Sequence, residues 1–144
     1  PNEAFTRDAR IVFLDDSIVR GTQLKDNVVK LRECGVKEVH IRIACPPLIY
    51  PCCFLNFSTS RSTFDLFARR VIRDLEGTSE LTDEILKPYS DPDSEKYKEM
   101  VRVMCQHLQL DSLQFQRLDD LVKAIGLPKE QLCTHCWDNS SYME

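Results

Sequence analysis

Residues 10–22 read RIVFLDDSIVRGT, and this stretch decides the fold of the chain. Residues 10–14 form a short apolar run rich in strand-forming side chains, which is typical of a buried central strand in a parallel sheet. The run stops at Asp15 and Asp16, and residues 17–22 lead into a helical pattern. The stretch therefore predicts a strand, a loop and the start of a helix.

The residues that follow complete a larger unit. Leu24, Val28 and Leu31 recur at helical spacing, and Gly35 follows as a stop signal. Residues 39–43 alternate between apolar and polar side chains and predict a second strand. Residues 10–45 together predict a βαβ unit with two parallel strands and a right-handed crossover.

The rest of the chain carries mostly helical patterns, and we divide it at its changes of pattern. We expect an irregular segment over 46–62, helices over 64–75 and 79–87, a helix from Pro92 to about Leu108 with Asp91 as its N-cap, a short strand over 113–116, and a helix over 118–125. This pattern predicts three parts, namely a core over 1–60, a helical insertion over 61–110, and a strand, helix and cysteine-bearing tail over 111–144.

Composition and charge exclude several classes of protein. The length of 144 residues suits about one domain with a real core. The 19 basic and 23 acidic residues give a net charge of -4, which argues against a nucleic-acid-binding module. The most apolar window, residues 41–55, contains Arg42 and three prolines and is therefore no membrane-spanning helix.

The loop after the first strand has the chemistry of a sugar-phosphate site. Asp15 and Asp16 would stand at the carboxyl end of a parallel strand, where open α/β sheets bind ligands, and two carboxylates can accept hydrogen bonds from vicinal hydroxyls or hold Mg²⁺. The loop then feeds a helix N-terminus, whose unpaired N–H groups favour a phosphate. The implied ligand is a ribose 5-phosphate. The plainer alternative is a solvated turn followed by an N-cap, and the stretch matches neither a Walker A loop nor a GxGxxG fingerprint.

The full run RIVFLDDSIVRGT resembles the phosphoribosyl-diphosphate (PRPP) signature of type I phosphoribosyltransferases, and its part LDDSIVRGT is most similar to the amidophosphoribosyltransferase family. Residues 31–52, 111–126 and 133–137 also resemble segments of that family, so that about two thirds of the chain is covered. The resemblance implies an α/β fold: part of a type I phosphoribosyltransferase with a Rossmann-like parallel sheet and a helical C-terminal extension.

The resemblance also implies a function, the first step of de novo purine synthesis. The family converts PRPP, glutamine and water into 5-phosphoribosylamine, glutamate and pyrophosphate. By this resemblance Asp15 and Asp16 contact the ribose hydroxyls and Mg²⁺. The residues expected to wrap the 5-phosphate are Ser17, Ile18, Val19, Arg20, Gly21 and Thr22. No side chain is expected to act as a protein nucleophile, because positioning and electrostatic stabilisation carry this displacement.

Further expectations concern the context of the chain. The implied partners are PRPP, an N-terminal glutaminase domain and further copies of the same chain, without nucleic acid or membrane, in the cytoplasm. Pro1 rather than Met opens the sequence, so we expect a piece of a longer protein that makes no phosphoribosylamine alone. Gln23 stands where the family usually has a second Thr, and Arg20 faces either the phosphate or a surface partner.

The seven cysteines suggest a possible metal site. Cys133 and Cys136 form a CxxC pair, which suits a zinc ion, an iron–sulfur cluster or redox chemistry, and which can also lack a metal. The resemblance implies a [4Fe–4S] cluster held by Cys52, Cys133 and Cys136, with Cys53 as a neighbour that could replace Cys52. The remaining candidates are assigned to packing: Cys34, Cys45 and Cys105 as small core residues, and His40 and His107 as structural histidines, while His135 could join a zinc site.

Two other functions fit the same residues. The chain could be a PRPP-binding regulatory protein of the phosphoribosyltransferase fold that does no chemistry. It could also be an interaction domain stapled by a metal, with a vestigial phosphate loop.

Overall fold

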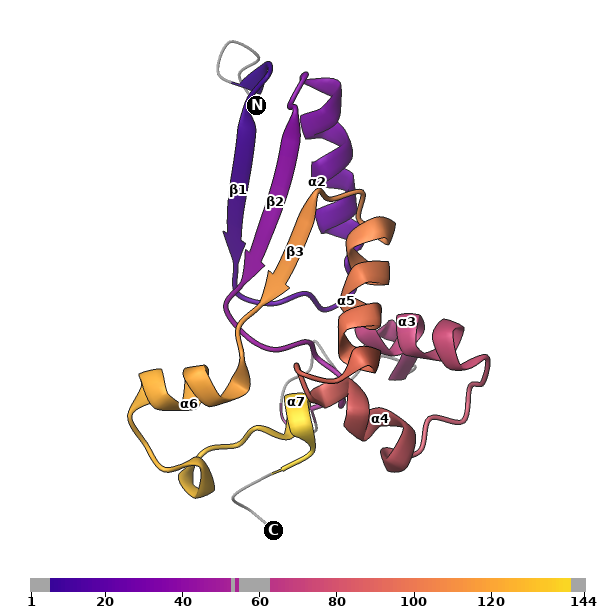
Figure 1. Cartoon of the computed structure of the whole chain (residues 1–144), viewed down its shortest axis with the longest axis vertical. Helices are drawn as coiled ribbons and strands as arrows, with labels where there is room; N and C mark the ends of the chain where they lie inside the picture. Colours follow the sequence, from indigo (N-terminus) through magenta and orange to yellow (C-terminus); the bar gives the residue numbers. More distant parts are fainter. Residues whose placement is uncertain (1–5, 53, 55–62, 141–144) are drawn as a thin grey trace.

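The computed structural model of the chain describes residues 6–52, 54 and 63–140. A small parallel sheet forms one end of the molecule, and a group of helices forms the other (Figure 1). The elements in chain order are β1 (Arg10–Asp15), α2 (Thr22–Glu33), β2 (Glu38–Ile43), the 3-10 turn η1 (Thr63–Asp65), α3 (Phe67–Glu76), α4 (Asp83–Ser90), α5 (Glu95–His107), β3 (Ser112–Phe115), α6 (Leu118–Ile125), the 3-10 turn η2 (Lys129–Gln131) and α7 (His135–Asp138).

The sheet contains the predicted βαβ unit. β1 and β2 pair in parallel, β2 and β3 pair in parallel, and the strand order is β1-β2-β3. Helix α2 makes the crossover between the first two strands, and its apolar stripe buries Val28 and Leu31 against Val39 of β2. The expected strand, loop, helix and strand over residues 10–45 are thus confirmed, as is the α/β fold class.

The two faces of the sheet differ in chemistry. Val39, Ile41 and Ile43 of β2 are buried beneath the helices, as the period of two in a strand requires. The opposite face carries a polar network, in which the ring of His40 bonds to Ser112 Oγ at 2.8 Å and to Glu38 Oε2 at 3.0 Å. His40 is therefore a structural side chain, as expected from its place on the polar side of the strand.

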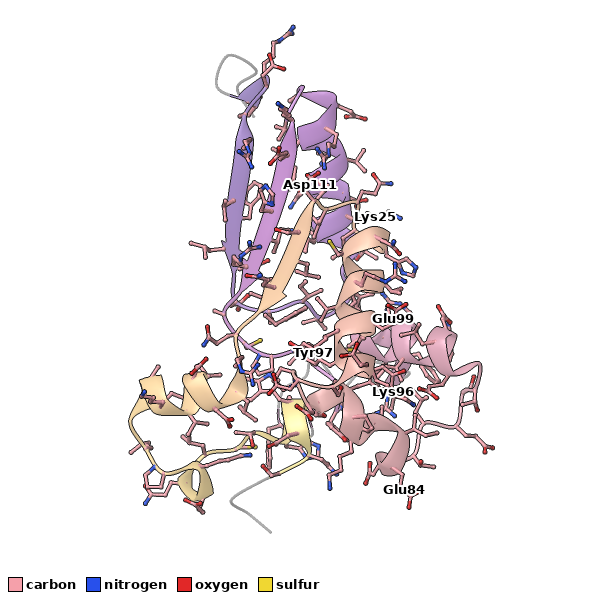
Figure 2. All side chains as sticks on the ribbon, viewed as in Figure 1. Lys25, Glu84, Lys96, Tyr97, Glu99 and Asp111 are labelled. Carbon is pink, nitrogen blue, oxygen red and sulfur yellow. The ribbon has the colours of Figure 1, made fainter. Side chains whose placement is uncertain are left out.

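A core of helices lies below the sheet. Side chains of α3, α4 and α5 pack with Ile41 and Ile43 in one cluster, in which Tyr89, Met100 and Met104 are buried. Figure 2 shows Lys96, Tyr97 and Glu99 on α5 beside these helices. The hydroxyl of Tyr89 donates to Glu76 Oε1 at 2.6 Å, and Lys96 pairs with the same oxygen, which ties the three helices together.

The prediction of a buried central strand over residues 10–14 is wrong for β1. The strand lies at the edge of the sheet, and the side chains of Val12 and Leu14 are 60% and 84% exposed. The apolar run makes a strand, as expected, but Val12 and Leu14 pair with His40 and Arg42 and so lie on the polar face of the sheet, opposite the helices. β1 is also the last strand on its side of the sheet. No strand pairs with that side of β1 in the described part of the chain.

Several helix boundaries also differ from the prediction, among them the start of α3, which lies at Phe67 and not at residue 64. Helix α5 takes Ser94 as its N-cap, whose Oγ accepts a hydrogen bond from the Tyr97 N–H at 3.0 Å. The expected cap, Asp91, instead ends α4 and accepts from the Asp93 N–H. Pro92 lies in the turn between these helices, so it does not open α5, and α4 itself begins four residues later than expected. A serine hydroxyl caps a helix as well as a carboxylate does, and Ser94 is the residue directly before the first turn of α5.

The last part of the chain returns to the sheet. Just before β3, Asp111 accepts hydrogen bonds from the Val39 N–H and from Arg32, both at 2.6 Å, and Figure 2 shows it at the start of that strand. The division into parts at 1–60, 61–110 and 111–144 stays a prediction, and β3 of the third part completes the sheet of the first. Among the helices of the described residues, none combines the length and apolar composition needed to cross a membrane.

Candidate functional site

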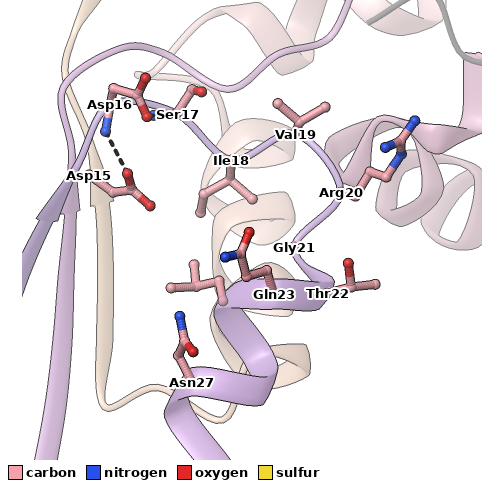
Figure 3. A pocket seen from close by; sticks show the side chains of 11 residues that line it. Asp15, Asp16, Ser17, Ile18, Val19, Arg20, Gly21, Thr22, Gln23 and Asn27 are labelled. Carbon is pink, nitrogen blue, oxygen red and sulfur yellow. Dashed lines mark hydrogen bonds between the residues drawn. The ribbon is translucent and has the colours of Figure 1, made fainter. Parts of the chain in front are cut away.

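The two adjacent carboxylates stand at the carboxyl edge of the sheet. Asp15 is the last residue of β1, and its carbonyl accepts a hydrogen bond from the Ala44 N–H at 2.9 Å. Each of the two side chains bonds the backbone of the next residue. Asp15 Oδ1 accepts a hydrogen bond from the Asp16 N–H at 3.0 Å, which is the dashed line in Figure 3. Asp16 Oδ1 accepts a hydrogen bond from the Ser17 N–H at 2.8 Å. Each carboxylate keeps its second oxygen for another ligand.

The loop after them is fixed against α3. Ile18 is buried in the main core, and the Val19 carbonyl accepts from the Phe67 N–H at 2.7 Å. The Arg20 carbonyl accepts from the guanidinium of Arg70 at 2.6 Å, and the same guanidinium also bonds carbonyls of η1. The backbone of the loop is therefore held in place without any ligand.

Gly21 makes the turn from the loop into α2. Its φ of +75° lies in the left-handed region, which glycine adopts without steric cost. A Cβ at this position would lie 3.1 Å from the ring of Phe67. The first turn of α2 contains no acidic residue, and its N-cap residue, Gly21, has no side chain that could accept hydrogen bonds from the N–H groups of this turn.

These features surround a hollow of about 520 Å³. It is lined by Asp15, Asp16, Ser17, Ile18, Val19, Arg20, Gly21, Thr22, Gln23, Leu24 and Asn27 (Figure 3). The structure thus brings all eight residues of the expected sugar-phosphate site around one cavity. Their assignment as ligand contacts stays a prediction.

Three lining residues were not singled out as site residues. Gln23, Leu24 and Asn27 of α2 line the hollow, and Figure 3 shows Gln23 and Asn27 facing it. The signal that could have found Asn27 is its spacing of four residues from Gln23 and three from Leu24, because such positions are neighbours on a helix surface. Asn27 also lines a smaller apolar groove of about 100 Å³ between β1 and α2.

Arg20 has a surface partner. Its guanidinium lies 3.7 Å from Asp65 Oδ2 and its side chain is 55% exposed. Figure 3 shows the side chain turned away from Asp15 and Asp16. Of the two interpretations of Arg20, the described geometry favours the ion pair on the surface.

The expected cluster cysteines come from two distant parts of the chain. The Cys136 carbonyl accepts from the Ile49 and Tyr50 N–H groups at 2.9 and 3.0 Å, which docks α7 beside the segment that carries Cys52. Burial raises the pKa of the Cys136 thiol, and the neighbouring thiols of Cys52 and Cys133 add to that rise, so that the pKa is about 12. In the described residues, however, no three His, Cys, Asp or Glu side chains form a group that could hold a metal ion. Cys53 lies outside the described residues.

The other cysteines and histidines have packing roles. Cys45 and Cys105 pack against the main core as expected, whereas Cys34 is half-buried outside both core clusters. Burial raises the pKa of Cys45, Trp137 lowers it, and the Asp16 and Asp15 carboxylates raise it, so that the pKa is about 11. The ring of His107 lies 6.2 Å from that of Phe67, and the ring of His135 lies 6.0 Å from that of Tyr50.

Known proteins are similar to this chain in sequence and in fold. No protein-family model matches the chain. An amidophosphoribosyltransferase of Mycobacterium bovis is 30% identical over 145 residues, which cover 100% of this chain and 23% of that protein. A solved structure of the allosteric regulatory enzyme of purine biosynthesis superposes with a TM-score of 0.67 at 26% identity, covering 96% of this chain and 24% of that one. The glutamine PRPP amidotransferase from B. subtilis, solved with ADP and GMP, gives a TM-score of 0.66 at 25% identity, covering 96% and 25%.

The fold and its loop therefore define a segment of the phosphoribosyltransferase class of α/β proteins. Within that class the chain is an amidophosphoribosyltransferase-related segment. It spans about a quarter of the length of the relatives that it matches.

Proposed function

We propose that the chain is the ribose-5-phosphate-binding part of an amidophosphoribosyltransferase. One observation carries the proposal: the hollow at the carboxyl end of β1 is bounded on one side by two carboxylates and on the other by the N-terminus of α2. A sugar phosphate has the matching pair of groups, vicinal hydroxyls and a phosphate dianion. The relatives at 30% identity are amidophosphoribosyltransferases, which supports the same ligand class.

The phosphate end of the ligand would bind at the start of α2. The N–H groups of the first helical turn carry a partial positive charge, and the N-cap residue, Gly21, has no side chain that caps them. Gly21 makes the turn into α2, where a larger residue would be strained at a φ of +75° and would place its Cβ 3.1 Å from the ring of Phe67. Thr22 adds a hydroxyl at the first position of the helix, while Gln23 places a carboxamide where the family usually has a second hydroxyl.

The ribose end would bind at Asp15 and Asp16. Their free carboxylate oxygens can accept hydrogen bonds from two vicinal hydroxyls, and two carboxylates together with water and phosphate oxygens also suit Mg²⁺. A bound Mg²⁺ would neutralise charge on the pyrophosphate leaving group. The residues of this chain would hold the sugar in place while its bond to pyrophosphate breaks.

The whole reaction is proposed for a longer protein. There PRPP and glutamine would be converted into 5-phosphoribosylamine, with ammonia supplied by a glutaminase domain, in the cytoplasm and in an oligomer of identical chains. The present chain would contribute the sugar-phosphate loop.

A [4Fe–4S] cluster held by Cys52, Cys133 and Cys136 is proposed as a structural group. The three thiols would supply three of the four cysteine ligands that such a cluster takes, and Cys136 interacts with both of the others. Such a group would lower the pKa of Cys136 from its raised value, because cations stabilise the thiolate. The expected result is iron and sulfide in protein purified without oxygen, reduced in the Cys136→Ser variant and unchanged in Cys34→Ser. Zinc in place of iron, or no metal in a folded chain, contradicts this proposal.

The test of the sugar-phosphate site is a calorimetric titration of ribose 5-phosphate and of PRPP, each with Mg²⁺, into the chain. We expect saturable binding that the Asp15→Asn/Asp16→Asn variant loses. The matched control is Asp119→Asn/Asp120→Asn, which removes an equally adjacent, exposed pair of carboxylates from the first turn of α6. Equal loss of binding in both variants, or no binding by folded wild-type chain, contradicts the proposal.

A further inference from the structure

One guanidinium on α3 joins two separate segments of the backbone. Arg70 Nη2 donates a hydrogen bond to the Arg20 carbonyl at 2.6 Å. Arg70 Nη1 donates to the Asp65 carbonyl at 2.9 Å and to the Phe64 carbonyl at 3.1 Å. Arg20 lines the hollow of the candidate site, whereas Phe64 and Asp65 belong to η1, which the chain reaches only after β2. The side chain of Arg70 therefore fastens the loop of the site to the start of the helical part.

These contacts suit arginine better than any other side chain. A guanidinium carries five N–H donors in a rigid planar fork and accepts no hydrogen bond, so it can bind several carbonyls at fixed directions. The amino group of lysine is a compact charge on a flexible stem. The fork of Arg70 is also held in place, because its central carbon lies 5.4 Å from the centroid of the Phe67 ring, which is buried in the main core.

Phe67 contacts the same loop with its backbone and with its ring. Its N–H donates to the Val19 carbonyl at 2.7 Å. Phe67 is the first residue of α3, so this N–H has no acceptor within its own helix. Its ring lies beside Gly21, where it would be 3.1 Å from an added Cβ. Phe67 and Arg70 thus contact three successive residues of the loop, which Figure 3 shows leading into α2.

We propose that Arg70 is a positioning residue for the sugar-phosphate site. It does not line the hollow itself, but it fixes the backbone of residues 19–21, which continues directly into the first turn of α2. The N–H groups of that turn are the proposed phosphate donors, so their direction depends on the loop before them. A site that is correctly shaped for only part of the time binds its ligand more weakly by that fraction. This inference rests on the proposed sugar-phosphate function.

The first test measures the affinity of the chain for ribose 5-phosphate with Mg²⁺ by calorimetry. Arg70→Lys keeps the positive charge without the fork, and Arg70→Gln keeps neither. We expect both variants to raise the dissociation constant about threefold to tenfold, because the loop loses hydrogen bonds that hold its shape. The control is Arg102→Lys, which loses a similar fork to Glu99 on α5 and should bind as the wild type does.

Three results of this titration contradict the proposal. If Arg70→Lys binds as tightly as the wild type and only Arg70→Gln is weakened, the charge of Arg70 acts and its geometry does not. If Arg102→Lys is weakened equally, the effect is general. If the Arg70 variants lower only the free energy of unfolding, measured with urea, and the folded protein keeps its affinity, Arg70 is merely structural.

The second test needs no ligand. Hydrogen exchange at the Phe67 amide, followed by NMR, reports directly on the bond between α3 and the loop, because the Val19 carbonyl is the acceptor of this N–H. In Arg70→Lys we expect this amide to exchange about threefold to tenfold faster, and the amide of Met104 inside α5 to exchange as in the wild type. Unchanged exchange at Phe67, or an equal rise at both amides, overturns the inference.

The two tests separate this inference from the function on which it rests. If the wild-type chain does not bind ribose 5-phosphate, the proposed function fails, and the role of Arg70 in binding fails with it. If the wild-type chain binds but the Arg70 variants bind equally well, only the inference about Arg70 fails.

Discussion

The turn at Gly21 gives a prediction whose size follows from the structure. In Gly21→Ala the new side chain must adopt a φ of +75°, which costs about 1–2 kcal/mol for an L residue. Its Cβ would also lie 3.1 Å from Phe67 Cδ1, closer than an ordinary contact. The ring has little room to move, because Phe67 is buried in the main core and lies against the guanidinium of Arg70. Displacing it adds about 0.5–1.5 kcal/mol, the cost of an off-rotamer side chain.

A second glycine separates these two contributions. Gly77 has a φ of +68°, and nothing lies within 4 Å of a Cβ built there. Gly77→Ala should therefore lose only the backbone contribution of about 1–2 kcal/mol. The free energy of unfolding, measured with urea and the fluorescence of the single tryptophan, should fall further in Gly21→Ala by about 1 kcal/mol. Equal losses in the two variants would refute the claim that Phe67 confines the loop, as would a smaller loss in Gly21→Ala.

Two further predictions concern the packing of the helices and the sheet. Lys96 and the Tyr89 hydroxyl hold the pKa of Glu76 below its ordinary range, so the stability from this carboxylate is present above the unfolded-state pKa and is lost as the pH falls through the lower folded-state pKa. Tyr89→Phe should weaken that acid dependence below about pH 4.5, measured by urea unfolding across pH, and an unchanged slope would contradict the assigned role of the hydroxyl. Leu14→Gln should change the free energy of unfolding by less than about 0.5 kcal/mol because Leu14 is exposed, whereas Ile41→Ala should cost about 2–5 kcal/mol. A large loss from Leu14→Gln would show that another part of the protein covers the edge of β1.

Local patterns in the sequence were sufficient to predict the βαβ unit. The spacing of Val28 and Leu31 and the alternation along residues 39–43 each specify one element, and a glycine marks the end of the helix between them. The strand at β3 and the helix at α6 were predicted for the same reason. These features depend on neighbours in the sequence, so the sequence alone reveals them.

Features that depend on distant neighbours were harder to predict. Leu14 is exposed because it pairs with Arg42 on the polar face of the sheet, and no local pattern encodes which face the helices cover. The start of α5 was set by competition between Asp91 and Ser94, two equally good caps three residues apart. Arg20 pairs with Asp65 only because the loop docks on α3.

In the candidate site, too, some features follow from the local sequence and others from contacts between distant residues. The run from Asp15 to Thr22 is continuous in sequence, and its order of carboxylates, glycine and hydroxyls predicts a common hollow. Asn27 lines that hollow because of the way α2 is rotated about its own axis relative to β1, and this rotation depends on how the helix packs on the sheet. The approach of Cys136 to Cys52 depends on the docking of the tail, and the sequence pointed to it only through a family resemblance.

The central claim is that the start of α2 binds a phosphate whose sugar lies on Asp15 and Asp16. The most direct measurement is the change in backbone ¹H–¹⁵N NMR signals when ribose 5-phosphate and Mg²⁺ are added to the chain. We expect saturable shifts concentrated on the amides of residues 16–24, with little change on α6, and no shifts in the Asp15→Asn/Asp16→Asn variant. Shifts centred elsewhere, or none in a folded chain at saturating ligand, would contradict it.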